Sequence, residues 1–520
     1  MYAGGPESKV SRRNLLIAGM SVAALSAASM IQGCGSDSVT QITSTSGSTA
    51  PPDQGSGNVV GPTPPAFIQP QVLRAVNGVL DTTLATSLAT NTVGGSPVTL
   101  RSYNGQLTGP TLRLKQGERL RVLLRNDLGA DVDPVPPANP DTPHQLNTTN
   151  LHTHGLHVSP QGNSDNIFVE IHPGDSFQYE YTIPTSQPPG TLWYHPHKHG
   201  SSNVQLISGM AGALIIEGGL DEVPAIKAAR DLVYLITELN VDGTGQVPLW
   251  NAANTNPFAL ANRRLLVNGQ LVPTLSAFSG EVIRLRIING TARAAVPFSI
   301  TGHTLNVISL DGIALPSMRQ VSSVLLPPAG RCDVLVRCGA PGNYDVQKLL
   351  DTSVTNNDAL VNIGVLNVLN TVVTMELPDK LPAPPYQNIT DAELTDPVKQ
   401  FTFAQANNSP PPFPNFTVNG VLFDPTRVDV TIPLNSVQEW ELINTTTNGH
   451  PFHIHVNDFM VVSVNNVPLP EPEWHDTFNI PKNGRIRIRH RFEDFKGMYV
   501  FHCHILVHED LGMMQTVNVV

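Results

Sequence analysis

Short segments in which apolar and polar residues alternate recur along most of the chain. In the segment RLRVLLRN, which ends at Asn126, apolar residues occupy every second position. Related segments end at Asn289 and Asn444. A period of two residues is typical of a β-strand with one buried face. Because turns rich in Pro and Gly separate these segments, the pattern predicts an all-β protein.

The strand pattern is part of a longer internal repeat. Each copy contains Asn-Gly, an apolar pair, a turn and then an alternating strand, and the copies begin at Tyr103, Val267 and Val418. Their spacings of 164 and 151 residues suit β-sandwich or Greek-key barrel domains. We therefore predict three consecutive domains over residues 67–228, 229–372 and 396–520, with a linker at 373–395.

Composition agrees with this organisation and narrows the choice of partner. The chain has 520 residues, enough for two to four domains, and only 14% of them are charged. Its 45 prolines outnumber the 31 lysines and arginines, which disfavours long surface helices. The formal net charge of −11 argues against nucleic acid as a partner.

The N-terminus has the features of an export signal. Lys9, Arg12 and Arg13 precede an apolar run that ends near Ile31, and the adjacent arginines indicate twin-arginine export. We assign residues 1–34 to this signal and residues 35–66 to a flexible linker rich in Ser, Thr, Gly and Pro. The segment IQGC is similar to a lipobox, so Cys34 is either a lipidated N-terminus or a chance thiol in the linker.

Histidines occupy matching positions in the first and third copies of the repeat and are missing from the second. The segments TNLHTH (149–154) and HPFHIH (450–455) correspond to VPFSIT (296–301). Likewise GTLWYHPH (190–197) and GMYVFHCH (497–504) correspond to GNYDVQKL (342–349). Because the middle copy lacks these histidines, the fold does not require them, and we infer that they have a chemical role.

Strand geometry divides the last of these segments into two sites. Residues i and i+2 of a strand share a face, so each His-X-His presents two imidazoles together, and four such pairs suit two or three copper, zinc or iron ions. Cys503 points to the opposite face from its neighbours. With His450 and His508 as ligands and Met513 as a weak axial ligand, it forms a blue-copper arrangement. The Cys503 backbone then provides a short electron path between the sites.

These motifs resemble a known family. HTHG, HPHKHG, HPFHIH and HCHILVHEDLGMM resemble, in order, the copper motifs of three-domain multicopper oxidases such as laccases, bilirubin oxidases and bacterial cuprous oxidases. The resemblance covers roughly residues 68–520. It implies three cupredoxin-like Greek-key domains, four copper ions and a reaction in which a donor is oxidised and O₂ is reduced to water. Carried over by position, it implies type 1 ligands His450, Cys503, His508 and Met513, type 2 ligands His152 and His453, and type 3 ligands His154, His195, His197, His455, His502 and His504.

Some residues near these motifs allow more than one interpretation. Glu509 and Asp165 resemble the family's proton-relay acids, but both could also be solvated loop carboxylates. We assign Asp510 to a loop. Met514 competes with Met513 as the axial ligand, and the family spacing favours Met513. The run that begins at Trp474 borders either the substrate entrance or only the domain core.

The sequence is compatible with two classes of electron donor, organic molecules and metal ions. A laccase-like enzyme oxidises phenols or aromatic amines, whereas a metallo-oxidase acts on Cu(I), Fe(II) or Mn(II). Cuprous oxidases commonly carry a methionine-rich segment, and the ten methionines of this chain cluster only at Met513 and Met514, which favours organic donors. A non-catalytic relative should have lost ligands, above all the cysteine. We expect an exported monomer, periplasmic, lipid-anchored or secreted, that uses O₂ as its acceptor.

Overall fold

The computed structural model describes residues 64–251, 253–255, 263–351, 358–406 and 412–520. Strands account for 49% of the chain and helices for 5%, which confirms the predicted all-β class. The predicted export signal, Cys34 and nearly all of the 35–66 linker lie outside the described residues. No helix in the part of the chain that the structure describes has the length and apolar character of a membrane span.

The first of three β-sandwiches is formed by residues between Val72 and Glu217. Its sheets have the orders β3-β2-β5-β7 and β1-β4-β9-β8-β6, and they enclose a core that includes Leu84, Leu124 and Tyr194. Its strands are β1 (Val72–Arg74), β2 (Val79–Val93), β3 (Ser96–Tyr103), β4 (Thr111–Lys115), β5 (Arg119–Asn126), β6 (His152–His154), β7 (Ser176–Thr182), β8 (Gly190–His195) and β9 (Gly212–Glu217).

The second sandwich is formed by residues between Arg230 and Val372. Its sheets have the orders β11-β10-β13-β18-β15-β16 and β12-β20-β19-β14-β17. Its strands are β10 (Arg230–Leu239), β11 (Arg264–Val267), β12 (Thr274–Ser279), β13 (Val282–Asn289), β14 (Val296–Ile300), β15 (Leu305–Leu310), β16 (Ile313–Val321), β17 (Val324–Leu326), β18 (Arg331–Arg337), β19 (Gly342–Lys348) and β20 (Val361–Val372).

The third sandwich is formed by residues between Lys399 and Val519. Its sheets have the orders β22-β21-β24-β29-β26-β27 and β23-β31-β30-β25-β28. Its strands are β21 (Lys399–Gln405), β22 (Phe416–Val418), β23 (Val430–Ile432), β24 (Ser436–Asn444), β25 (His450–Ile454), β26 (Phe459–Val464), β27 (Val467–His475), β28 (Thr477–Ile480), β29 (Arg485–Phe492), β30 (Gly497–Cys503) and β31 (Met514–Val519).

The internal repeat of the sequence reappears in the topology. Strands β5, β13 and β24 each pair in parallel with the preceding long strand and antiparallel with a later one. Each ends at the repeated asparagine, whose side-chain amide donates to the carbonyls of neighbouring loops. The acceptors are Ile171 for Asn126, Leu326 for Asn289 and Ile480 for Asn444. These residues close the same corner of each sandwich, so they are part of the scaffold.

The histidine-bearing strands also have equivalents in the sandwich that lacks them. Strand β6 pairs with β8, and β25 pairs with β30. The corresponding pair in the second sandwich is β14 and β19, in which the matching residues include Ser299 and Gln347. The same two-strand ladder therefore occurs in each sandwich, and histidines are present on it in the first and third.

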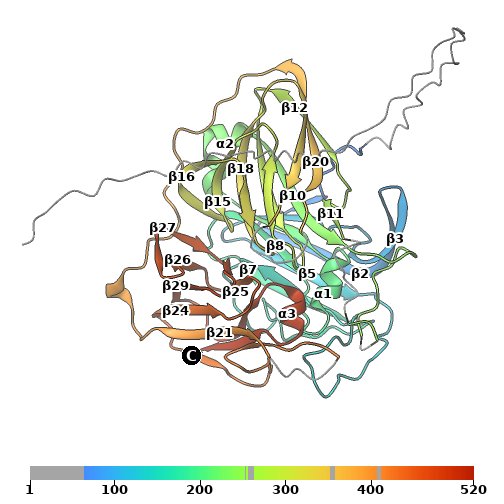
Figure 1. The fold of residues 1–520 in the computed structure, drawn as a ribbon, viewed down its shortest axis with the longest axis vertical. Coiled ribbons are helices and arrows are strands. Elements are labelled where there is room, and N and C mark those ends of the chain that lie inside the picture. The colour runs from blue at the N-terminus through green and yellow to red at the C-terminus, as the bar shows by residue number, and fades with distance from the viewer. Residues whose placement is uncertain (1–63, 252, 256–262, 352–357, 407–411) are drawn as a thin grey trace, which may run out of the picture. The chain divides into compact units, whose positions relative to one another are not determined.

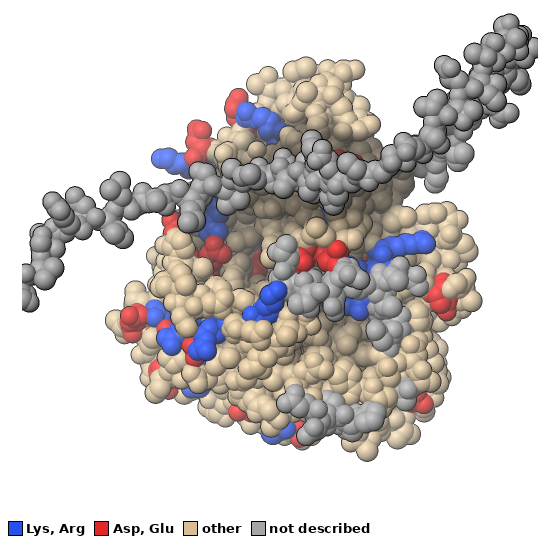
Figure 2. All heavy atoms as spheres, in the orientation of Figure 1, with Lys and Arg blue, Asp and Glu red and all other residues tan. Residues whose placement is uncertain are grey.

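The three sandwiches share buried contacts, and short helices contribute to them. One apolar cluster includes Trp193, Ile288 and Phe501, one residue from each sandwich. Figure 1 shows α1 of the first sandwich beside α3 of the third. On the face drawn in Figure 2, charged side chains of both signs are scattered over a largely uncharged surface. The helical elements are α1 (Ser202–Ile207), η1 (Gly219–Glu222), α2 (Pro224–Ala228), η3 (Asp391–Glu393) and α3 (Leu506–Asp510).

Candidate metal centre

The two histidine ladders place eight imidazoles between the first and third sandwiches. On β6 and β8, His152 lies opposite His195, and on β25 and β30, His453 lies opposite His502. The alternation of the strands directs both members of each His-X-His pair to one side. All eight side chains are at most 1% exposed. They are His152, His154, His195, His197, His453, His455, His502 and His504.

The imidazoles fall into groups small enough to hold individual ions. Within each group, the possible ligand atoms lie within 4.8 Å of one another. Each histidine group combines residues from the first and third sandwiches, so neither sandwich completes one alone. The groups are His152, His154 and His453; His154, His195 and His504; and His197, His455 and His502.

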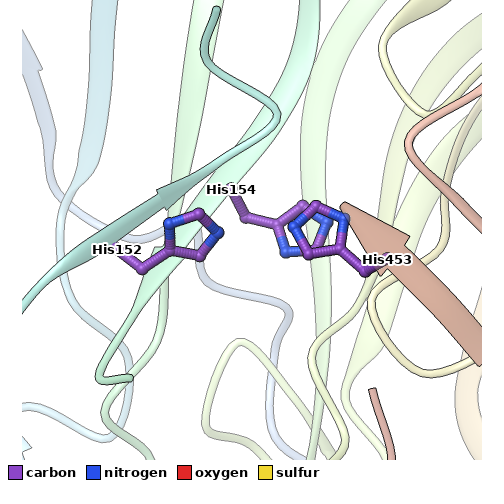
Figure 3. A group of neighbouring side chains, drawn as sticks. All are labelled: His152, His154 and His453. Carbon is purple, nitrogen blue, oxygen red and sulfur yellow. The ribbon is translucent and has the colours of Figure 1, made fainter. Parts of the chain in front are cut away.

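The rings pack directly against one another across the interface. His154 and His453 are stacked with ring centroids 3.7 Å apart, and His152 and His455 are stacked at 3.9 Å. Figure 3 shows His152 and His154 projecting from one ribbon toward His453 on the facing strand. Stacked neutral imidazoles alone do not explain this cluster, because many of their nitrogens make no hydrogen bond.

Those unpaired nitrogens fit a metal cluster. His152 Nδ1 lies 2.9 Å from Asp165 Oδ2, and His453 Nδ1 donates to the Asp476 carbonyl at 2.8 Å. The second nitrogen of each ring, Nε2, is buried without a hydrogen-bond partner, and the same holds for His195 Nε2. Ligand histidines typically have one nitrogen held by the protein while the other binds the metal. A buried nitrogen that has neither a hydrogen-bond partner nor a metal lowers the stability of the folded protein. These histidine nitrogens are therefore suited to bind metal ions.

Burial keeps His152, His195 and His453 in the form that binds metals. It lowers the pKa of His152 and His453 well below the ordinary value, and neighbouring histidines lower both further. Burial likewise lowers the pKa of His195 to about 3. These three rings are therefore neutral at physiological pH, and neutral imidazole is the ligand form.

Cys503 belongs to a separate group on the opposite face of its strand. Its Sγ lies 3.3 Å from His450 Nδ1 and 3.6 Å from His508 Nδ1, and those two nitrogens are 3.2 Å apart. Thr446 Oγ1 lies 2.8 Å from His450 Nε2, which orients Nδ1 toward the sulfur. This compact Cys-His₂ triangle has the donor set of a trigonal copper site.

Both Cys503 and Met513 are fully buried in the same apolar cluster. Burial raises the pKa of the Cys503 thiol well above its ordinary value. A thiolate at this position therefore needs a bound cation to be stable. Met514 lies in a different apolar cluster, with Val500 and Phe423, which supports Met513 over Met514 as the axial candidate.

One member of this triangle reaches a pocket at the surface. His508 is partly exposed and lines a cavity of about 250 Å³. Ile505 and Asn448 lie beside it, and Arg293 and Asp351 bring charges of both signs to the same cavity. A small donor in this cavity would contact the edge of an imidazole in the Cys503 group.

The two predicted relay acids are buried, so the solvated-loop interpretation of both is wrong. Asp165 is 3% exposed, accepts hydrogen bonds from the Thr153 backbone and hydroxyl, and burial raises its pKa to about 7. Glu509 is fully buried, with its carboxylate oxygens 3.5 Å from His197 Nδ1 and 3.1 Å from His502 Nδ1. Burial alone raises the pKa of Glu509, but its histidine neighbours together lower it to about 2.

The structure corrects one assignment made from the sequence. Asp510 is not a loop residue, because it is the last residue of α3 and is fully buried. Its Oδ1 accepts from the Gly200 backbone at 2.7 Å and from the Ser202 hydroxyl at 2.8 Å. The Asn203 backbone N–H donates to its Oδ2 at 2.9 Å. Asp510 therefore joins α3 to α1 across the interface between the two sandwiches.

Sequence reasoning did not identify Asp476 as part of the site. Its Oδ1 lies 3.2 Å from His154 Nε2, and its backbone carbonyl accepts from His453. Its carboxylate is bound by Arg331, which comes from the second sandwich. The sequence signal was weak, because Asp476 lies outside the histidine motifs and Arg331 is distant along the chain.

Comparisons with known proteins agree with this donor set. Three family models described as multicopper oxidase match residues 144–220, 240–371 and 392–520. A multicopper oxidase of Staphylococcus haemolyticus is 29% identical over 80% of this chain and 83% of its own length. A laccase of Bacillus subtilis is 26% identical over 81% of this chain and 90% of its own. The solved structure of a Campylobacter jejuni multicopper oxidase, described as a metallo-oxidase, aligns with a TM-score of 0.69 at 25% identity, covering 87% of this chain and 96% of that one.

The chemistry of the site and these matches lead to one assignment. Imidazole and thiolate donors suit copper, which the family uses, and the buried nitrogens described above fit bound ions. The predicted cupredoxin-like fold is confirmed by the sandwiches and by the structural matches. The chain is a member of the multicopper oxidase family and an oxidoreductase.

Proposed function

We propose that the protein oxidises a small donor in one-electron steps at a type 1 copper and reduces O₂ to water at a trinuclear copper cluster. The type 1 ligands are His450, Cys503, His508 and Met513. The type 2 ligands are His152 and His453, and the type 3 ligands are the six remaining cluster histidines. Bound copper supplies one-electron redox chemistry at both places.

The observation that carries this proposal is the position of Cys503 between two cluster histidines. His502 and His504 lie in two different histidine groups. The sulfur of Cys503, between them in the sequence, belongs instead to the group with His450 and His508. An electron accepted at the Cys503 site therefore has one residue of backbone to cross in either direction. This covalent bridge couples donor oxidation to O₂ reduction without a mobile carrier.

Proton supply is the second requirement, because four protons enter the two waters formed from each O₂. Ser202 Oγ lies 3.0 Å from Glu509 Oε1 and 2.8 Å from Asp510 Oδ1, so its one hydroxyl proton can be donated to either carboxylate. This hydrogen-bonded series leads from the α1–α3 contact to His197 and His502. We assign proton transfer to Glu509 on one side of the cluster and to Asp165, beside His152, on the other.

The cavity at His508 is the proposed binding place of the donor. It contains apolar and charged residues, and none of the described residues that line it is a methionine. Its Asp358 is also held by Lys348 and lies 3.6 Å from Arg263, so this carboxylate is already neutralised. Cu(I) prefers thioethers, and Fe(II) or Mn(II) prefers uncompensated oxygen ligands. The lining therefore favours a phenol or aromatic amine, with a metal ion as the alternative donor.

The direct test is the stoichiometry of turnover by copper-loaded protein. A phenol, Cu(I), Fe(II) and Mn(II) are supplied separately while O₂ uptake and hydrogen peroxide are measured. We expect four one-electron oxidations for each O₂ and no peroxide, with the phenol giving the highest kcat/KM. Peroxide as the main product would remove the trinuclear proposal, and a higher kcat/KM for a metal ion would reverse the choice of donor.

The relay assignment has its own test. Glu509→Gln keeps the size of the side chain and removes its ionisable proton, so we expect a lower kcat and an altered pH profile of kcat. Copper content is measured in parallel. Unchanged turnover and an unchanged pH profile in fully loaded protein would eliminate Glu509 as a relay.

Export and domain limits complete the proposal. The twin-arginine signal directs the chain to the periplasm or beyond, with Cys34 as a candidate lipid anchor, and replacing Arg12 and Arg13 by lysine should retain the protein in the cytoplasm.

We propose a monomer with domain limits at 67–228, 229–372 and 396–520. Sedimentation and limited proteolysis test these two points.

A further inference from the structure

Two aromatic side chains outside the proposed copper sites form a pair with an unusual polar contact. The rings of Tyr386 and Trp474 have centroids 4.6 Å apart at an interplanar angle of 36°. The Tyr386 hydroxyl donates to Asp458 Oδ2 at 2.6 Å. By contrast, the hydroxyls of Tyr194 and Tyr344 donate to backbone carbonyls. A carboxylate can take the phenolic proton when a tyrosine is oxidised, whereas a backbone carbonyl cannot.

The pair forms a wall shared by two surface cavities of about 360 and 390 Å³. The first cavity lies between β16 and β27, and four prolines and Leu315 line it together with the two aromatic rings. Arg319 and Glu473 at its rim are paired with each other, and Glu473 also contacts His475. Glu471 adds a second carboxylate to the lining, which disfavours anions. A cavity of this size with two ring faces therefore suits a small aromatic molecule that carries no negative charge.

Each aromatic residue is linked to the histidine cluster through a short stretch of chain, Trp474 by its own position and Tyr386 through Asp458. Asp458, which binds the Tyr386 hydroxyl, follows His455 by three residues. The Asn457 backbone N–H donates to the His455 carbonyl at 2.7 Å, so this turn is compact and spans less than about 11 Å. On the other side, Trp474 precedes by two residues the Asp476 carboxylate that contacts His154. The pair therefore lies between a solvent cavity and the cluster.

We propose that Tyr386 and Trp474 form a second electron-delivery route, through which an uncharged phenol in the cavity between β16 and β27 reduces the histidine-held copper cluster without using Cys503. This inference rests on the proposed trinuclear cluster. It assigns a binding site to the cavity and a redox role to two side chains that no copper motif includes.

The route balances in atoms and electrons. Tyr386 gives one electron to the oxidised cluster and its phenolic proton to Asp458 Oδ2. The phenol in the cavity then returns one electron through the Trp474 ring, and the proton moves back from Asp458 to the Tyr386 oxygen. The phenol is left as a one-electron-oxidised radical and releases its own proton to water. Four such cycles supply the electrons for one O₂, the oxidant of the proposed activity.

The basicity of Asp458 supports the proton step. Burial, followed by the nearby charges of Asp476 and Asp311, raises the pKa of Asp458 to about 8. The Tyr386 hydroxyl and Arg331 lower this pKa but do not cancel the increase. His157, Arg491, Glu493 and Asp494 line the cavity on the same side. A carboxylate with a raised pKa is a stronger proton acceptor than an ordinary aspartate.

The test uses the full chain with the first route blocked. Cys503→Ser protein is loaded with copper and supplied with 2,6-dimethoxyphenol and O₂ about one pH unit above the pKa of Asp458. We expect slow phenol oxidation that exceeds the rate of copper-free protein. Adding Tyr386→Phe should lower this residual rate about tenfold or more. Adding Tyr344→Phe, the matched control, should leave it unchanged.

A second readout detects the intermediate directly and does not depend on turnover. The reduced, copper-loaded Cys503→Ser protein is mixed with O₂ in the absence of phenol, frozen rapidly and examined by electron paramagnetic resonance. We expect an organic radical whose hyperfine splitting narrows when the protein contains ring-deuterated tyrosine. The signal should disappear in Tyr386→Phe and persist in Tyr344→Phe.

A third readout needs no copper at all. Methoxybenzene, an analogue with no phenolic proton, is titrated into the metal-free protein, and binding is followed by calorimetry. Trp474→Ala should weaken binding about tenfold. Any one of three results would overturn the proposal: methoxybenzene does not bind, the Cys503→Ser protein shows no residual phenol oxidation, or the radical signal persists in Tyr386→Phe. Failure of the proposed trinuclear cluster can be distinguished from failure of this second route. In the former case the wild-type protein itself would release peroxide.

Discussion

Arg331, on a strand of the sandwich without histidine pairs, binds Asp476 of the third sandwich with both ends of its guanidinium. Nη1 donates to Oδ1 at 2.6 Å and Nη2 donates to Oδ2 at 2.5 Å, and both side chains are fully buried. Asp476 in turn contacts His154 of the first sandwich. The middle sandwich therefore fixes the orientation of imidazoles in a cluster to which it contributes no histidine.

We expect Arg331→Met to destabilise the protein strongly. It leaves the Asp476 carboxylate buried without its cation, which typically costs about 3–5 kcal/mol. Arg319→Met is the control, because Arg319 pairs with Glu473 at a partly exposed site and its loss should cost less than about 1 kcal/mol. The free energy of unfolding of the metal-free proteins, from urea titration, gives the comparison. Equal losses in the two variants would show that the buried pair has no special role.

Asp165→Asn should weaken copper binding while the fold is retained. Asp165 Oδ2 holds His152 Nδ1 at 2.9 Å, and loss of such an outer contact typically lowers metal affinity about 10–100-fold. Copper affinity is measured by competition with a chelator. Asp81→Asn, at an exposed surface pair with Arg121, is the matched control and should bind copper as the wild type does. Unchanged affinity in Asp165→Asn would refute the orienting role.

Stability should fall as pH rises above neutrality because of His475. Burial alone lowers the pKa of His475, but hydrogen bonds to Asp311 and Glu473 raise it to about 9. Because the pKa of His475 is higher in the folded protein than in the unfolded chain, the protonated imidazole stabilises the fold. This contribution is fully present below the unfolded-state pKa of 6.5 and is lost as the pH rises through about 9.

The variant His475→Gln isolates this contribution. The wild type should lose about 3 kcal/mol of unfolding free energy across that pH window relative to the variant. Denaturant titrations at both ends of the window provide the measurement. Parallel pH profiles for the two proteins would mean that His475 stays neutral in the folded state.

Gly190→Ala should disrupt the contact between the first and second sandwiches. A Cβ at Gly190 would lie 1.8 Å from the backbone carbonyl oxygen of Gly312, which follows β15, and neither backbone can move without shifting its sheet. We expect a loss of at least about 3 kcal/mol in unfolding free energy. Gly243→Ala is the control, because its Cβ meets no atom within 4 Å. Similar thermal midpoints for the two variants would contradict the close approach.

The parts of the structure that local pattern determines could be predicted from the sequence. Alternation located the strands, and the repeated Asn126, Asn289 and Asn444 marked equivalent strand ends because each forms the same loop contacts. The separation of Cys503 from its histidine neighbours also followed from strand geometry. The type 1, type 2 and type 3 assignments remain predictions.

Long-range contacts could not be predicted in the same way. Asp510 was assigned to a loop, because no local pattern indicates that Gly200 and Asn203 bind its carboxylate from another sandwich. The contact between Arg331 and Asp476 joins residues 145 positions apart, and no motif connects them. Burial of Asp165 and Glu509 likewise depends on how the sandwiches pack.

The central claim is that Cys503 belongs to one copper site and its neighbouring histidines to another. Absorption spectra and copper content of wild-type and Cys503→Ser protein test it most directly. The wild type should show the intense blue band of a copper–thiolate site, and the variant should lose that band together with one copper ion while keeping the other three. A wild-type protein that is colourless when fully loaded, or a variant that loses all its copper, would contradict the account.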